Sequence, residues 1–428
     1  MNQKKSKGKK IRIYDVAEYF FAFLLILQFR SIYIYCDEFK WATGRSLAIA
    51  IVLMVLICCA SKRRIQVGKL KNLVKFAILA TAFIGFHFVI RHYALEQTLR
   101  FLILTISVAT YHYLCGNEEY RYALLYKYEN LIVIIAGISL FFWIFGSNLG
   151  AFHPSSTVYS SWTSTGTNTV KAVSNYHGVY FETQIVRFVG LFRIVRNTAI
   201  FTEGPMCSFH FALALMIELF LRQRTNVKKV VFLSVAVVTN FTTTGIIIGL
   251  LAIAIKIFMD NRKRSIWGYI RILIFPAIII GVIVTVEYLI QSRIGTRSGS
   301  TRIDDLVAGY KAWKESPLFG HGYGNDGSYQ KYMSSFRIDN DGFSNSIMLI
   351  LSYGGVYLLL PYLYAGVKSI RNGLKQKDYK NIVFMLLYVL MLAVTVAPFQ
   401  ALTIYLFILF NAYATQLVFS QKINRGRD

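Results

Sequence analysis

The chain has 428 residues, of which 55% are hydrophobic and 15% aromatic, but only 16% are charged. A soluble domain is nearer about 25% charged, so this composition excludes an ordinary soluble protein and predicts an integral membrane protein built from helices alone. Lys and Arg number 47 against 21 acidic residues, but they cluster between apolar runs and form no recognisable nucleic-acid module, so a nucleic-acid partner is not expected.

The basic N-terminal segment MNQKKSKGKKIRIYD resembles the start of a signal peptide. The apolar run after it is long enough to span a membrane and lacks a small-residue cleavage site, so we expect a retained first helix. The five cysteines are scattered and show no metal-ligand spacing. We therefore expect neither a disulfide framework nor a bound metal, and no other cofactor.

Apolar runs along the chain predict the membrane crossings, since a spanning helix needs about 20 apolar residues. Ten runs meet or approach this length, near 16–35, 45–60, 73–90, 97–114, 131–147, 198–221, 270–290, 346–366, 381–397 and 400–419. Together with one longer run, they predict about twelve transmembrane helices.

The longer run, from 230 to 259, is too long for one ordinary crossing and short for two. The basic segment DNRKR follows it and would lie outside after a single crossing, against the preference of Lys and Arg for the cytoplasm. We therefore expect two crossings that turn back at NFTTTG (240–245), where hydroxyls can satisfy exposed backbone groups. A single tilted helix is the alternative.

Twelve crossings place both termini in the cytoplasm and leave two long segments outside, residues 148–197 and 291–345, within a single polytopic domain of residues 1–428. Most basic residues then lie in short cytoplasmic loops, as the positive-inside rule requires. The basic residues of the outer segments are mainly Arg, whose planar guanidinium suits phosphate, whereas Lys predominates inside. We therefore expect the functional face to be external.

The first outer segment has two chemically different parts. Residues 151–182 are rich in Ser, Thr, Asn and aromatic residues, which suits carbohydrate binding, although such loops are often merely solvated. The following stretch RFVGLFRIVRNTAIFTEGP contains Arg187, Arg193, Arg196 and Glu203. If it is helical, Arg196 and Glu203 share a face.

Pro205 is suited to the first turn of the next membrane helix, which would place Glu203 at the outer interface. The partial positive charge of a helix N-terminus would then add to the arginines and favour a bound anion. The alternative is an Arg–Glu ion pair that only fixes the loop to the membrane. Because a carboxylate at membrane depth is costly unless it is used or paired, we favour a functional role.

The second outer segment begins with Thr301 as an expected helix N-cap and Asp304 three residues later. Apolar residues then recur at helical spacing, which predicts an amphipathic helix lying against the membrane or the bundle, with Arg302 in its first turn. The glycine-rich SPLFGHGYG follows. His321 and Tyr323 are candidate glycan-binding residues there, with catalysis or a hydrogen-bonded loop histidine as alternatives for His321.

The stretch RIDNDGFSNS ends this segment before the next apolar run. It supplies Asp339 and Asp341 as candidate catalytic acids, with a solvated polar turn as the alternative. Ser344 and Asn345 could cap the following helix or bind sugar.

In these residues the chain resembles the O-antigen polymerase and O-antigen ligase superfamily, more narrowly the polymerases of capsular or exopolysaccharide repeat units. The resemblance rests on GLFRIVRNTAIFTEGPM, TNFTTTGIIIGL, STRIDDLVAGYKAWKESPLFGHGYG and GFSNSIMLILSYGGVYLLL, and covers about residues 185–366. Ligases of the superfamily place a His where this chain has Ser344, so the resemblance favours a polymerase.

The resemblance implies a metal-independent, GT-C-like glycosyltransferase in the bacterial cytoplasmic membrane. Its donor and acceptor would be undecaprenyl-pyrophosphate-linked glycans, and a chain-length regulator and a flippase of the same pathway are possible partners beside the lipid bilayer. The family's pyrophosphate-binding arginines map onto Arg187, Arg193, Arg196 and Arg302. We further hypothesise that Glu203 takes the proton of the attacking sugar hydroxyl, with Asp339 or Asp341 as substitutes, and that the reaction inverts the anomeric carbon.

Two other functions fit parts of this pattern. A ligase would transfer the glycan to a different acceptor. A transporter or flippase of lipid-linked sugars would also have about twelve helices, but transporters commonly show related halves, whereas here the charge concentrates in two dissimilar loops.

Overall fold

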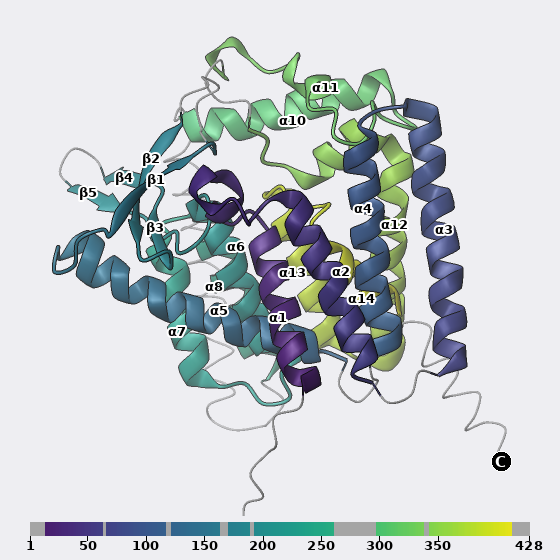
Figure 1. Cartoon of the computed structure of the whole chain (residues 1–428), viewed down its shortest axis with the longest axis horizontal. Helices are drawn as coiled ribbons and strands as arrows, with labels where there is room; N and C mark the ends of the chain where they lie inside the picture. The colour runs from purple at the N-terminus through teal and green to yellow at the C-terminus, as the bar shows by residue number, and fades with distance from the viewer. Residues whose placement is uncertain are drawn as a thin grey trace, which may run out of the picture.

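The computed structural model describes residues 13–62, 66–116, 121–162, 170–188, 192–260, 297–337 and 342–412. The protein is mostly helical, as the composition predicts (Figure 1). Six helices of this part of the chain are long and apolar enough to cross a membrane, which indicates a multi-pass membrane protein, and further apolar helices are shorter. The predicted crossing at 270–290 lies outside the described residues.

The first half of the chain forms α1 (Ile13–Gln28), α2 (Gly44–Ala60), α3 (Val67–Arg91), α4 (Leu95–Thr110) and α5 (Ala123–Phe142). Short 3₁₀ and π turns accompany them: η1 (Ile32–Tyr35), η2 (Asp37–Phe39), η3 (Tyr111–Cys115) and η4 (Trp143–Asn148). The local sequence determines where some of these helices begin. For example, Thr43 caps α2 by accepting a hydrogen bond from Ser46 N (3.0 Å), and Ser46 Oγ accepts one from Thr43 N (2.9 Å).

The second half forms α6 (Gly204–Met216), η5 (Ile217–Leu221), α7 (Val227–Thr239), α8 (Thr243–Met259), α10 (Arg297–Glu315), α11 (Gly327–Gln330), η6 (Ser335–Arg337), α12 (Ser346–Gln376), α13 (Tyr379–Ala393) and α14 (Ala401–Ala412). Helix α6 is the core of the bundle: nearly all of its residues are buried, and it packs against α5, α7, α8 and α13. Helix α3 lies at the edge of the bundle (Figure 1) and leaves Ile78 and Leu79 exposed, as a lipid-facing helix would.

The long apolar run at 230–259 is broken where the sequence predicts. Helix α7 ends at Thr239 and α8 begins at Thr243, and Phe241 between them has a left-handed φ of 49°. The Asn240 side chain donates a hydrogen bond to the Asn197 carbonyl, which ties this turn to the segment before α6. The break therefore brings the threonine-rich turn to the end of the bundle where α6 begins.

Residues 148–197, the first segment predicted to lie outside, contain strands, which the all-helical prediction does not include. Strands β1 (Ser156–Ser160), β2 (Lys171–Tyr176) and β3 (Tyr180–Glu182) form an antiparallel sheet, and β4 (Ile185–Phe188) pairs with β5 (Phe192–Val195). Val158 and Val173 are register partners and both are buried, whereas Tyr159 is exposed, which is the alternation of a half-buried strand. The stretch before Glu203 is therefore not helical, so the condition under which Arg196 and Glu203 would share a helical face is not met.

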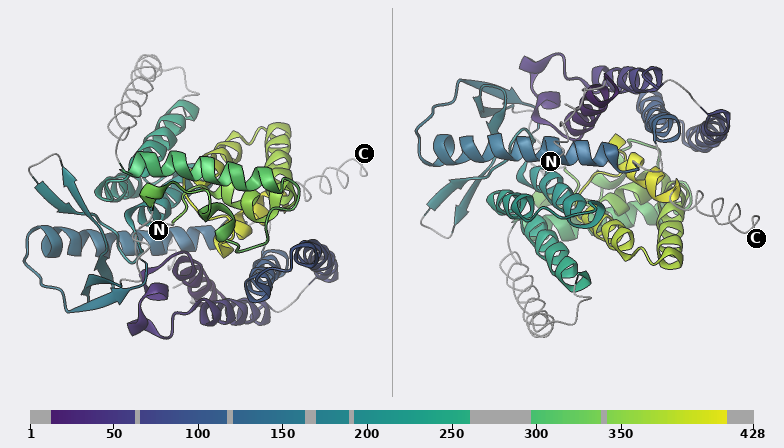
Figure 2. Two further views of the ribbon diagram at one scale, coloured as in Figure 1. Left: turned by 90° about the horizontal axis from the view of Figure 1, so that it is seen from above. Right: turned by 90° about the horizontal axis from the view of Figure 1, so that it is seen from below.

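Helix α10 lies across one end of the bundle (Figures 1 and 2) and packs on α12. Small residues make this contact: Ala308 and Ala312 are buried, and a Cβ added to Gly309 would lie 2.6 Å from Met348 Cβ. The predicted helix is confirmed, and Ile303 on its apolar face is 65% exposed, so of the two predicted surfaces the membrane is favoured over the bundle for this residue. Thr301 is not its N-cap, because the helix already begins at Arg297.

The glycine-rich loop after α10 fills a kink in α12. Gly355 has φ 58° and ψ −157° inside that helix, a conformation that favours glycine. The loop satisfies the interrupted backbone: His321 N donates to the Ser352 carbonyl (2.9 Å), and Val356 N donates to the Pro317 carbonyl (2.9 Å). The glycines of SPLFGHGYG thus allow the loop carrying α10 to dock closely on α12.

Candidate functional site: an arginine-rich end of the bundle

Glu203 lies at the start of the buried helix α6, at its N-cap position with φ −157°, and Pro205 occupies the first turn as predicted. The Glu203 side chain is 22% exposed, and its Oε1 lies 3.6 Å from Arg30 Nη1. Burial raises the pKa of Glu203, while the positive charges of Arg30, Arg196 and Arg302 act in the opposite direction. The structure thus brings the predicted residues Arg196, Arg302 and Glu203 together and adds Arg30.

The three arginines come from separate elements. Arg30 follows α1 and has a left-handed φ of 56°, Arg196 follows β5, and Arg302 lies in α10. Gln184 holds Arg196 against the first turn of α6, because its Oε1 accepts hydrogen bonds from Arg196 Nη1 (3.3 Å) and from Gly204 N (3.0 Å). The convergence therefore depends on tertiary structure, not on spacing along one helix.

Aromatic residues and a fourth arginine border this end. The Arg30 guanidinium lies 4.8 Å from the centre of the Trp162 ring, which in turn contacts Tyr35 (5.0 Å between ring centres). Burial raises the pKa of Tyr35, and the charges of Arg30 and Arg100 oppose that shift, so Arg100 of α4 is also close. Sequence analysis missed Arg30 and Arg100 because each flanks or interrupts an apolar run and has the pattern of a topology signal.

A pocket opens beside these arginines, between α6, α8 and α13. Its polar lining includes Arg302, Ser208 and Thr242, and its apolar lining is formed by Pro205, Phe209, Ala212, Ile248 and Met391. The N-termini of α6 and α8 both lie at this place, since Gly204 approaches the Asn240 carbonyl and Thr242, and Gly245 approaches Ser208. Two helix N-termini and several guanidiniums give the site a positive field suited to an anion.

Several buried hydroxyls at this place make no hydrogen bond within the part of the chain that the structure describes. They are Thr202 Oγ1, Ser208 Oγ and Thr242 Oγ1. All three residues are at most 5% exposed. A buried polar group without a partner costs about 1–3 kcal/mol, so these hydroxyls favour a polar ligand or water in the site.

The candidate glycan-binding residues of the second segment have structural contacts. His321 Nε2 donates a hydrogen bond to the Ala312 carbonyl (2.8 Å) and lies 3.5 Å from Glu315. These contacts match the alternative interpretation of His321 as a hydrogen-bonded loop histidine. Tyr323 stacks on Phe101 (5.0 Å between ring centres), and the charge of Arg100 opposes the rise that burial causes in the pKa of Tyr323. Tyr323 therefore lies at the margin of the arginine-rich end.

Ser344 and Asn345 also serve the fold. Ser344 N donates to Asp305 Oδ2 (3.0 Å), and Asn345 caps α12 by accepting a hydrogen bond from Met348 N (2.9 Å). Capping by Asn345 is thus confirmed. Asp305 also accepts a hydrogen bond from the buried Arg337 (2.7 Å), and this network fixes the chain before α12 to α10.

The structure does not describe the side chains of the other predicted site residues, Arg187, Arg193, Asp339 and Asp341. The backbones of Arg187 and Arg193 are register partners in the β4–β5 pair. Asp339 and Asp341 lie outside the described residues. No group of three or more His, Cys, Asp or Glu residues that could hold a metal occurs in the ranges that the structure covers.

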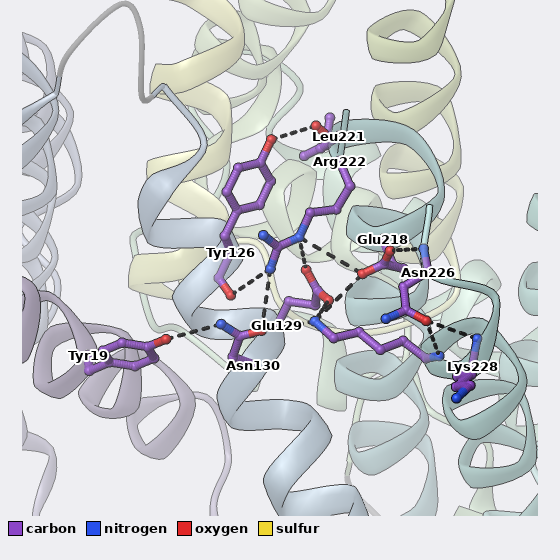
Figure 3. Close-up of polar contacts among 10 residues, drawn as sticks. Tyr19, Tyr126, Glu129, Asn130, Glu218, Leu221, Arg222, Asn226 and Lys228 are labelled. Atoms are coloured by element: carbon purple, nitrogen blue, oxygen red, sulfur yellow. Dashed lines mark hydrogen bonds and ion pairs between the residues drawn. The ribbon is translucent and has the colours of Figure 1, made fainter. Parts of the chain in front are cut away.

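The opposite end of α6 carries a second charged cluster, in which the charges are closely paired (Figure 3). Arg222 Nε donates to Glu129 Oε2 (2.7 Å), and Lys229 Nζ donates to Glu129 Oε1 (2.8 Å). Glu218 accepts a hydrogen bond from Asn226 N (2.6 Å). Both carboxylates are almost fully buried, so this cluster joins α5, α6 and α7 and has little access to a ligand.

The fold and the arginine-rich end thus describe a helical multi-pass membrane protein with an anion-compatible site. No protein-family model and no curated protein matches the sequence.

Proposed function

We propose that the protein is a polysaccharide polymerase that joins undecaprenyl-pyrophosphate-linked oligosaccharide repeat units on the outer face of the bacterial cytoplasmic membrane. The observation that supports this most is the convergence of Arg30, Arg196 and Arg302 on Glu203 at one end of the bundle. Guanidiniums are suited to a pyrophosphate leaving group, and a carboxylate with a raised pKa is suited to accept a proton.

In the proposed reaction, a hydroxyl of the acceptor glycan attacks the anomeric carbon of the donor. A new carbon–oxygen bond forms there, and the bond between the anomeric carbon and the pyrophosphate oxygen breaks with its electron pair. Glu203 takes the hydroxyl proton. The guanidiniums stabilise the negative charge that develops on the leaving pyrophosphate, and fixed charges in a partly buried site do this better than water.

The test is incubation of the purified protein with one synthetic undecaprenyl-pyrophosphate repeat unit. A ladder of longer lipid-linked products and free undecaprenyl pyrophosphate is expected. A single transfer to a different acceptor would instead identify a ligase. Movement of the unit across a vesicle membrane with no change in its length would identify a flippase.

A further inference from the structure

Two cysteine thiols meet at the end of α2 that lies away from the arginine-rich end. Cys59 is in the last turn of α2, and Cys115 is the last residue of η3, which packs against α2. Their Sγ atoms are 3.4 Å apart. At the opposite end of α2, a Cβ added to Gly44 would lie 2.8 Å from Arg100 Nη1. The length of α2 therefore separates this thiol pair from the arginines.

The two sulfur atoms of the thiol pair are close enough to form a covalent bond after a small movement. A disulfide is about 2.05 Å long, so the atoms need to approach by roughly 1.4 Å, which small changes of the side-chain torsions can supply. Both cysteines are free in the structure, and 56 positions separate them in the sequence. A bond between them would fasten the end of α2 to the end of η3.

A lysine beside the thiol pair favours the reactive form of a thiol. Lys62 follows α2, and its Nζ donates hydrogen bonds to the carbonyls of Leu114 (3.4 Å) and Cys115. Burial lowers the pKa of Lys62, whereas negative charge on Cys115 or Cys59 raises it, so the ammonium is near both sulfur atoms. A nearby cation stabilises a thiolate, and the thiolate is the nucleophile in thiol oxidation.

The two thiols differ in their access to a small oxidant. Cys59 is 9% exposed and Cys115 is 2% exposed. Susceptibility to oxidation follows thiolate character and exposure, so Cys59 is suited to meet the oxidant and Cys115 to resolve the product. Cys58 precedes Cys59 on α2 and is fully buried, and it therefore supplies a matched control.

We propose that Cys59 and Cys115 form a reversible disulfide when the protein meets hydrogen peroxide. The Cys59 thiolate attacks one peroxide oxygen, the oxygen–oxygen bond breaks with its electron pair, and a sulfenic acid and hydroxide form. The Cys115 thiolate then attacks the sulfenic sulfur and displaces a second hydroxide. Each hydroxide takes up the proton that one thiol released, so two thiols and one peroxide give one disulfide and two water molecules. A thiol reductant reverses the oxidation.

This inference goes beyond the proposed function and does not depend on it. Tyr14, near the start of α1, donates a hydrogen bond to the Cys115 carbonyl (3.2 Å), so the thiol pair lies at the end of the bundle where α1 begins. The topology predicted from the sequence places that end in the cytoplasm. Disulfides in this reducing compartment are usually transient and often sense oxidants.

The experiment counts reactive thiols in the full-length protein in nanodiscs after exposure to hydrogen peroxide. Denaturation in a maleimide reagent followed by intact mass measurement should show two fewer reactive thiols than the five of the reduced chain. Dithiothreitol should restore them, and peptide mapping should find Cys59 linked to Cys115. Cys58→Ser should also lose two thiols, whereas Cys59→Ser and Cys115→Ser should form no internal disulfide.

The rate of oxidation tests the role of the lysine. Lys62→Ala should slow disulfide formation by about tenfold, because less of the thiol is ionised. Lys71→Ala removes an exposed lysine of α3 and should keep the wild-type rate. Melting temperatures show whether each variant is folded before oxidation.

The inference is overturned if all five thiols stay reactive under conditions that oxidise free glutathione in the same sample. A disulfide that includes Cys58 would also overturn it. So would a Cys59 sulfenic acid that dimedone traps while Cys115 stays reduced, since Cys115 would then not resolve the product. The ladder assay tests the polymerase separately, because it contains no oxidant.

Discussion

The two ends of α6 combine the same kinds of charged group in different ways. At the end where Glu203 lies, the nearest guanidinium atom, Nη1 of Arg30, is 3.6 Å away, and buried hydroxyls nearby make no hydrogen bond to described residues. At the other end Glu129 accepts hydrogen bonds of 2.7 and 2.8 Å from Arg222 and Lys229. Removal of one partner from a close buried pair destabilises a fold, whereas several guanidiniums near one carboxylate and unbonded hydroxyls are suited to an exchangeable anion.

This difference predicts that the two ends respond to mutation in opposite ways. Substitutions at the Glu203 end should reduce activity more than stability, because the ion pair between Glu203 and Arg30 is longer (3.6 Å) than the pairs of Glu129. Substitutions at the Glu129 end should reduce stability and preserve the activity of the protein that remains folded.

The largest effect is expected for Arg302→Ala. Loss of one guanidinium that stabilises a developing negative charge should lower the rate of polymer formation by about 10²–10³-fold. Arg45→Ala is the control, since Arg45 forms an exposed pair with Glu96 and should polymerise at the wild-type rate. The ladder assay measures both, and wild-type chain lengths in the Arg302 variant would contradict the proposed role.

The next largest effect is expected for Arg222→Ala, which should lower the free energy of unfolding. It leaves the buried carboxylate of Glu129 without its guanidinium, which should cost about 3 kcal/mol. Denaturant unfolding of the purified protein measures this loss. The double variant Arg222→Ala, Glu129→Gln should recover part of it, because the buried charge is then removed, and no recovery would mean that the pairing is not the cause.

Glu203→Gln tests the base at the arginine-rich end. It should slow polymer formation by about 100-fold, since general-base catalysis is lost. In the wild type the rate should fall as the pH is lowered through the raised pKa of Glu203, because the protonated acid cannot accept the hydroxyl proton. This acid limb of the profile should be absent in the Gln variant. Glu96→Gln, at an exposed position, should keep the wild-type profile.

The residues of the site differ in how far the sequence could reveal them. Residue chemistry was sufficient to group Arg196 with Glu203, because arginines and an acid beside an apolar run are unusual, whereas Arg302 was added through the family resemblance. Arg30 and Ser208 could not be identified in this way, because their positions at this end arise from the meeting of α1, α6 and α8, which is a tertiary property. Serine within an apolar helix is an ordinary pattern.

The fold was predictable to a similar extent. Apolar length was sufficient to locate most helices, and the polar break at NFTTTG located the turn between α7 and α8. The strands were missed because Ser- and Thr-rich sequence with little charge fits a solvated loop as well as a strand, and only burial of Val158 and Val173 distinguishes the two. Whether such a segment forms a loop or a strand therefore depends on contacts between segments that are distant in the sequence.

The smallest effect tests whether the kink in α12 supports the arginine-rich end. In Gly355→Ala the new Cβ would lie 2.4 Å from the Leu318 carbonyl carbon at a φ of 58°, so the loop after α10 must shift and stability should fall by about 1–3 kcal/mol. Gly366→Ala on the same helix is the control, since its Cβ would meet only Met385 Sδ at 3.9 Å. Equal unfolding free energies for the two variants would mean that the loop is not held by the kink. If the kink does hold it, the position of Arg302 depends on a backbone feature at the far end of α10, and the Gly355 variant should lose some activity as well as stability.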